Sequence, residues 1–199
     1  MPIIATRASA AYGAGFGKSA AAAPVVIETG SYDAIASVTI PSGGVSSFTF
    51  AGIPLGYRNL EIYWKMATSV GNRDMLINFN DDTSAVYQNF IVYAGSGAVN
   101  SAALVGQTKI IWGGGTSTVN EFAGGTTTIF DADSSVKYKG VQAVYGYAYN
   151  GSSIGTDGTA NLNHSLNSWG SLSPISKITI SVSSGVINAN SSFDLYGVK

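Results

Sequence analysis

Cysteine is absent from this 199-residue sequence, and charged residues are scarce, at 11% of the chain. Without cysteine there can be no disulfide, no thiolate nucleophile and none of the common cysteine-containing zinc sites. Basic and acidic residues nearly balance, 10 against 11, and no basic run occurs. Nucleic-acid binding depends on clustered positive charge. The sequence therefore predicts no nucleic-acid partner and a fold stabilised by packing alone.

Long hydrophobic runs are also missing. No stretch approaches the roughly 18 consecutive apolar residues of a membrane-spanning helix, so we expect no membrane insertion. Hydrophobic residues nevertheless make up 45% of the chain, which is enough to form the core of a globular domain. Serine, threonine, asparagine and glycine take the place of the missing charges.

Short strand-like runs dominate the sequence after residue 31. Each is rich in β-branched or aromatic residues and is bounded by glycine, proline, asparagine, aspartate or serine. No segment carries a helical apolar stripe over ten or more residues. We expect an all-β chain folded as an antiparallel β-sandwich, jelly-roll-like because that is the commonest form with many short strands. The ten runs cover residues 37–40, 46–50, 60–66, 75–79, 89–93, 108–112, 126–130, 141–149, 177–182 and 192–198.

Clean alternation marks three of these runs as strands with one buried face. In 60–66 the residues Leu60, Ile62, Trp64 and Met66 fall on one face, and polar residues fall between them. The run 177–183 alternates isoleucine and valine with lysine, threonine and serine. The last run, "SSFDLYGVK", alternates in the same way, so we expect a structural strand there.

The first 24 residues differ from the rest, because alanine and glycine dominate and Pro24 closes the segment. We expect an N-terminal arm over 1–24, followed by one β-sandwich domain over 25–199. Small residues let an extended backbone lie close to a partner. The arm residues predicted to anchor it on that partner are Ile3, Ile4, Arg7, Tyr12 and Phe16.

Catalytic and nucleotide-binding motifs are not found. "GAGFGKS" at 13–19 ends like a phosphate loop, but Tyr12 stands where the first glycine of that motif belongs. His164, the single histidine, lies among polar residues and reads as a surface loop residue, since no nucleophile motif accompanies it. We therefore expect no cofactor and no enzymatic activity.

Two short acidic clusters, "FNDDTS" at 79–84 and "FDADSS" at 130–135, follow strand-like runs. Their oxygen atoms are the kind that calcium prefers, but neither cluster has the spacing of a calcium-binding hand. Aspartate and asparagine also hydrogen-bond their own backbone in turns. Turn formation is the favoured interpretation, with calcium binding as the alternative, and we expect no metal.

Three tyrosines, Tyr145, Tyr147 and Tyr149, alternate along one run and would share a strand face. Such a row packs well in a core or between subunits, because each ring is apolar and each hydroxyl is polar. The alternative is a sugar-binding platform. The segment 149–169 carries the fewest strand signals and is the predicted binding loop if the protein recognises a sugar.

Several segments together resemble virion structural proteins of tailed bacteriophages, of the kind found in marine and cyanobacterial phages. They are "IIATRASAAYGAGFG" at 3–17, the stretch 32–62 with its Phe50–Pro54 turn, "INFNDDTSAVY" at 77–87 and the ending Leu195–Lys199. These motifs are structural and carry no chemistry.

The resemblance implies a structural protein of the virion, either a capsid-decorating or a tail-fibre-like component. Its partners would be other capsid or tail proteins and further copies of itself, most commonly as a homotrimer. The arm would attach the sandwich domain to the particle. The alternative function is a carbohydrate-binding, receptor-recognition module of a tail fibre, with a host-surface glycan as its partner.

Overall fold

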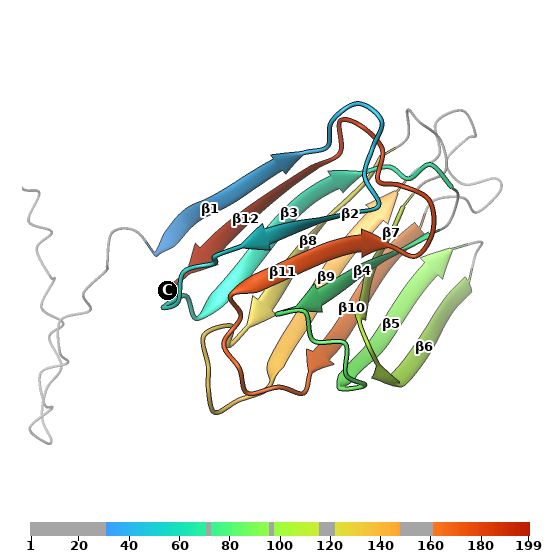
Figure 1. Ribbon diagram of the computed structural model, residues 1–199. Coiled ribbons are helices and arrows are strands. Elements are labelled where there is room, and N and C mark those ends of the chain that lie inside the picture. Colours follow the sequence, from blue (N-terminus) through green and yellow to red (C-terminus); the bar gives the residue numbers. More distant parts are fainter. Residues whose placement is uncertain (1–30, 71–72, 96–97, 116–121, 148–160) are drawn as a thin grey trace, which may run out of the picture.

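The computed structural model describes residues 31–70, 73–95, 98–115, 122–147 and 161–199. Two antiparallel sheets stack face to face over these residues (Figure 1). The strands are β1 (Tyr32–Thr39), β2 (Ser47–Ala51), β3 (Asn59–Met66), β4 (Arg73–Phe79), β5 (Tyr87–Gly95), β6 (Ala98–Gln107), β7 (Ile110–Gly115), β8 (Ala123–Phe130), β9 (Lys139–Tyr147), β10 (Asn161–Trp169), β11 (Lys177–Val182) and β12 (Ser192–Val198).

The order of the strands gives the sandwich a jelly-roll-like topology. The large sheet runs β1-β12-β3-β8-β9-β10-β5-β6, and the small sheet runs β2-β11-β4-β7. Strands pair in a nested way, β1 with β12, β2 with β11, β3 with β8 and β4 with β7, as in one long hairpin rolled around the core. The predicted all-β, jelly-roll-like sandwich is confirmed.

Two additional hairpins extend the large sheet. β9 and β10 follow β8 in the sheet, and β5 and β6 follow β10, so the large sheet has eight strands against four in the small one. Figure 1 shows β5 and β6 at the far side of the molecule from β1. β6 is consequently the last strand on that side.

Alternation places the core as the sequence predicts. Leu60, Ile62, Trp64 and Met66 on β3 are all buried against the small sheet. On β11, Ile178 and Ile180 are fully buried and Val182 is half-buried. Since the side chains of a strand alternate between faces, one face of each strand supplies the core and the other stays accessible.

The C-terminal run forms β12, which lies between β1 and β3 and hydrogen-bonds to both. Its inner residues Phe193 and Leu195 are fully buried, and the Phe193 ring centroid lies 4.6 Å from that of Phe48 on the small sheet. The expected structural strand at 192–198 is confirmed, and it is an interior strand of the large sheet.

Two strands were not among the ten predicted runs. β6 is built mainly from small residues with little β preference. β10 spans Asn161–Trp169, a segment that the sequence predicts to be a loop. The prediction is wrong because the buried face of β10 carries Asn163, Ser165 and Asn167, whereas its leucines face solvent. A hydropathy pattern therefore does not reveal this strand.

The described residues include no helix that is long and apolar enough to cross a membrane.

Candidate interaction surface

The outer face of the large sheet is the broadest accessible strand surface of the described residues. Cross-strand partners point to the same side of a sheet, so the strand register defines rows across this face. One row runs through Tyr196, Glu61, Thr128, Gln142, Leu166, Phe90 and Ala103. It begins polar and aromatic at the β12 end and becomes apolar toward β10 and β5.

A tyrosine cluster, which we define as Tyr32, Tyr63 and Tyr196 with the carboxylate of Glu61, occupies the first part of the outer face. Tyr32 stacks on Tyr196 with ring centroids 5.0 Å apart, and Tyr63 meets Tyr196 edge-on at 5.7 Å. The hydroxyls of Tyr32 and Tyr63 donate to Glu61 Oε2 at 2.6 and 3.2 Å. Burial and the hydrogen bond to Glu61 raise the pKa of Tyr32, so its hydroxyl stays a donor.

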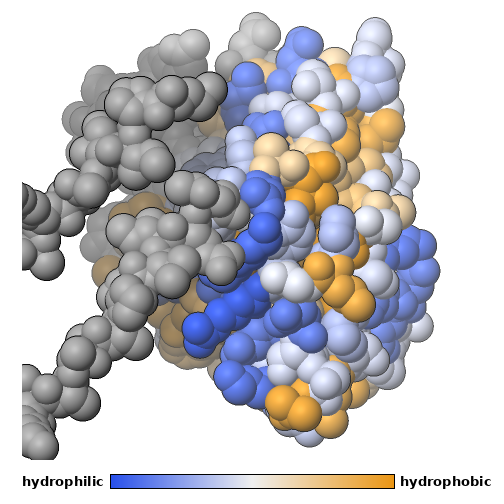
Figure 2. All heavy atoms as spheres, turned by 90° about the vertical axis from the view of Figure 1, so that its left-hand side faces the viewer, coloured by the Kyte–Doolittle hydropathy of each residue, from blue (hydrophilic) through white to orange (hydrophobic). Residues whose placement is uncertain are grey.

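An apolar half, defined as Phe90, Val144, Leu162 and Leu166, occupies the outer face over β9, β10 and β5. Leu162 is 63% exposed and Leu166 is 52% exposed, and Phe90 lies directly opposite Leu166 across the strands. Contiguous exposed apolar side chains on a protein surface mark contact sites. By contrast, the side that bears β1 mixes hydrophilic and hydrophobic residues (Figure 2).

His164 lies within the apolar half, exposed on β10, and not in a loop as the sequence predicts. Its Nε2 atom lies 2.8 Å from Nε2 of the Gln142 amide on β9. The imidazole thus contacts an amide, whereas a catalytic triad requires a carboxylate to orient the ring and a nucleophile beside it. The histidine belongs to the surface, as expected.

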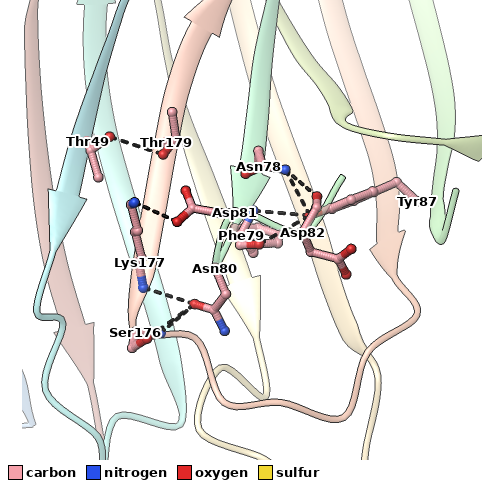
Figure 3. Close-up of polar contacts among 10 residues, drawn as sticks. All are labelled: Thr49, Asn78, Phe79, Asn80, Asp81, Asp82, Tyr87, Ser176, Lys177 and Thr179. Carbon is pink, nitrogen blue, oxygen red and sulfur yellow. Dashed lines mark hydrogen bonds and ion pairs between the residues drawn. The ribbon is translucent and has the colours of Figure 1, made fainter. Parts of the chain in front are cut away.

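The first acidic cluster, 79–84, forms a hydrogen-bonded turn in the connection from β4 of the small sheet to β5 of the large sheet (Figure 3). Asn80 Oδ1 accepts hydrogen bonds from the backbone N–H groups of Ser176 and Lys177 at 3.0 and 3.1 Å, and Lys177 pairs with Asp81 at 2.7 Å. Asn80 and Asp81 both have positive φ, at 51° and 58°. Asparagine and aspartate tolerate this conformation better than other side chains. Turn formation at 79–84 is therefore confirmed.

The second cluster is also a turn. Asp131 has a φ of 53°, and its carbonyl accepts the Ser134 N–H at 3.0 Å. Its carboxylate pairs with Lys137 at 3.2 Å. Within the described parts of the chain, no three histidine, aspartate or glutamate residues come together as a metal-binding group.

Of the three tyrosines predicted to share a surface, Tyr145 lies inside the core. It is only 7% exposed, and its ring centroid is 5.8 Å from that of Trp64. It faces inward because β9 directs Lys139, Val141, Ala143 and Tyr145 to the same buried side. Tyr145 is therefore a core residue, and the prediction that it lies on a subunit-binding or sugar-binding surface is wrong. The Tyr147 side chain and Tyr149 lie outside the described residues.

The predicted arm also lies outside the described residues, with its anchors Ile3, Ile4, Arg7, Tyr12 and Phe16. Residues 149–160 of the predicted binding loop do so as well. The remainder of that segment, 161–169, is β10.

Lys139 is a buried cation that the sequence patterns did not predict. Lys139 is fully buried, and its Nζ donates to the carbonyls of Ser134, Lys137 and Ser171. Burial lowers its pKa. It ties two loops together at the end of the sandwich, which is a structural task. The alternation of β9 would have revealed it, since Lys139 shares the face of Val141.

An open cavity of about 490 Å³ lies at one end of the sandwich. Lys65 Nζ stands 5.0 Å from the ring centroid of Phe122 in its wall. The remaining lining residues are Gly43, Gly44, Ser69, Val186, Asn188, Ala189 and Asn190. The mixture of one cation, amides and small apolar residues identifies no ligand class.

The four outer edges of the two sheets differ in how they are closed. β1 has a bulge between Ala34 and Ala36, and Asp33 at its start pairs with Lys199 at 3.1 Å. β2 has only five residues. Asn89 on β5 occupies the edge of β7: its Oδ1 accepts the Ile111 N–H at 2.9 Å. Bulges, charges and short strands are the usual means by which an edge avoids pairing.

β6 lacks most of these devices. Its sequence, "AVNSAALVGQ", contains no charged residue, and its pairing with β5 is regular from Ala98 to Leu104. The bulge follows only beyond Leu104, near Gly106, which has a φ of 66°. Nothing in the described chain pairs with the outward side of β6. No described strand therefore covers the edge of the large sheet beside the apolar half.

No family model matches the chain, and neither a curated protein nor a solved structure matches it.

Proposed function

We propose that the protein is a non-enzymatic structural protein of a tailed-phage particle, a surface-exposed β-sandwich knob that its N-terminal arm attaches to the capsid or tail. The observation that carries the proposal is the apolar half of the outer face, where Leu162, Leu166 and Phe90 stand in contact with solvent. An apolar surface of this kind is stabilised when another protein covers it.

Several features of the chain support a role in an assembly. The knob has a broad strand surface and, among the residues described, no group of metal ligands. Its single histidine contacts a glutamine. Stability comes from a large aromatic and aliphatic core, including Trp64, Trp112 and Trp169, without cysteine. Such a knob is insensitive to thiol–disulfide exchange, since it has no thiol.

Antibody labelling of phage particles that encode the chain tests the virion assignment. Label over the head would support decoration, and label at the tail would support an appendage. Particles that carry no label, while lysates contain the protein, would contradict the proposal.

The proposal includes self-association of the knob, and the family resemblance implies three copies. Mass measurement by light scattering gives the number. Replacing Leu162 and Leu166 by Ser should weaken association with copies or with particles, because it removes the most exposed part of the apolar half. Thr126→Ser, on the same face, is the matched control and should change nothing.

A second function, carbohydrate recognition, is favoured by the tyrosine cluster. Sugar rings present C–H faces that pack on aromatic rings, and their hydroxyls donate to carboxylates. Tyr63 is 43% exposed and lies beside Glu61, so both kinds of contact are available at one place. The platform would thus lie on β1, β3 and β12 and not at Tyr145.

A glycan array probed with the full chain tests this second function. If the cluster binds sugar, Tyr63→Ala should abolish the signal, since it removes one ring. Tyr138→Ala is the control, because Tyr138 is 64% exposed outside the cluster. A blank array over host-envelope sugars, or equal loss in both variants, would count against recognition.

A further inference from the structure

We propose that β6 pairs antiparallel with β6 of a second copy, so that two large sheets join into one continuous sheet across a two-fold axis. The inference gives a contact for the self-association proposed above and to that extent rests on it. Because a two-fold contact joins copies in even numbers, it replaces the three copies that the resemblance implies, and a trimeric wild type would overturn it. It is carried by the contrast between β6 and the other three sheet edges.

Each of the other edges is protected against a further strand. The bulge of β1 interrupts its outward hydrogen-bonding row between Ala34 and Ala36. β2 is too short to offer a long row. The Asn89 amide fills the hydrogen-bonding positions at Lys109, just before β7, and at Ile111, near the start of β7. The edges at β1, β2 and β7 thus carry features that discourage pairing with another strand, whereas the edge at β6 lacks them.

The stretch 98–104 of β6 presents seven regularly spaced residues without a charge, a proline or a bulge. Its outward backbone N–H and C=O groups have no partner in the chain as described, and backbone groups of a strand pair best with another strand. The partner that best satisfies these backbone groups is therefore another β-strand, and not a small molecule or a charged surface.

A second copy fits this edge because β6 is complementary to itself. If two β6 strands cross antiparallel at Ser101, Val99 lies opposite Ala103 and Asn100 lies opposite Ala102. No like charges meet, and the small side chains impose no clash on either face. The same arrangement is isologous, as in most homodimers.

The apolar half continues into the contact. Ala103 lies directly opposite Phe90 on β5, and Phe90 lies opposite Leu166 on β10. Pairing at β6 brings the apolar half of each copy toward that of the other, on the same face of the joined sheet. Copies consequently assemble in even numbers through this contact.

Light scattering on the full chain should give twice the 20.4-kDa chain mass, or an even multiple of it. Ser101→Lys should raise the dissociation constant of the pair by at least about fivefold, because two lysines meet at the axis. Thr126→Lys adds the same charge to the same face away from the edge and should leave the mass unchanged.

Charge exchange provides the decisive readout. Ser101→Glu alone should also weaken the pair, whereas an equimolar mixture of Ser101→Lys and Ser101→Glu should restore it. A merely destabilised strand would not be rescued by mixing. Failure of the mixture to associate, with both variants folded, would overturn the proposal.

Hydrogen exchange separates the second copy from other occupants of the edge. Outward amides within 98–104 should be protected at high protein concentration and exposed on dilution. Protection that does not depend on concentration would mean that another segment of the same chain covers β6. A monomeric wild type would contradict both this inference and the proposed self-association, whereas an oligomer unaffected by the Ser101 variants would contradict the β6 contact alone.

Discussion

The side-chain amide of Asn89 pairs with the backbone of Ile111 as though it were a neighbouring strand. Asn89 Oδ1 accepts the Ile111 N–H at 2.9 Å, and its Nδ2 donates to the Lys109 carbonyl at 3.2 Å. Asn89 belongs to the large sheet and Ile111 to the small one, so one buried side chain links the two layers where the small sheet ends.

Asn89→Leu should destabilise the protein by about 1–3 kcal/mol, because it leaves the half-buried Ile111 N–H and Lys109 carbonyl without their partner. Chemical denaturation followed by tryptophan fluorescence measures the free energy of unfolding. Gln88→Leu is the control, since Gln88 is the exposed neighbour on the opposite face of the strand. Equal effects from the two substitutions would show that the amide pairing contributes nothing.

Deletion of Phe193–Lys199 should prevent cooperative folding. The deletion removes most of β12 from between β1 and β3 and exposes the hydrogen-bonding edges of both neighbours. Removal of Lys199 alone, which pairs with Asp33 at the surface, should leave a folded protein. A soluble truncated chain with a sharp thermal transition would contradict the interior position of β12.

Gly125→Ala should destabilise the sandwich by about 1–3 kcal/mol, a typical cost of overpacking. A Cβ atom at Gly125 would lie 2.5 Å from the Val144 carbonyl oxygen and from Tyr145 Cβ, where Tyr145 packs toward Trp64. Gly140→Ala, between the same two strands, meets only the Phe130 side chain, at 3.6 Å or more, and should be tolerated. Thermal unfolding of the two variants compares the sites directly.

The protein should lose stability at alkaline pH through Tyr87. Burial raises the pKa of its phenol from 10.0 to about 12, so the folded state holds its proton more tightly than the unfolded state. Its stabilising contribution is complete below pH 10 and is lost as the pH rises to about 12. Unfolding free energies across this range should fall less steeply in Tyr87→Phe. An unchanged slope in that variant would assign the effect to other tyrosines.

Segments with regular alternation could be predicted from sequence because burial of a single face leaves a direct hydropathic signature. Leu60–Met66, 177–182 and 192–198 are strands with the faces expected. β10 escaped because its buried positions are Asn163, Ser165 and Asn167 and its leucines face outward. A hydropathy pattern cannot distinguish such a strand from a polar loop.

The interaction surface could be predicted even less, since its members are far apart in the chain. Tyr32, Tyr63 and Tyr196 come from three strands that meet only after β12 inserts between β1 and β3. The spacing of Tyr145 from neighbouring tyrosines predicted a shared strand face, but β9 directs its side chain into the core. Sequence spacing predicts which residues share a face but not which face becomes buried.

The sequence by itself determined that this protein is an all-β sandwich without disulfides, because short alternating strands and turn residues are local signals that need no partner to be recognised. The tertiary structure alone decided which strands are interior and which are edges. That distinction depends on pairing between residues more than a hundred positions apart, as when Tyr32 meets Val198. Among the described residues, it leaves the outward side of β6 without a strand partner, while Asn89 occupies the edge of β7.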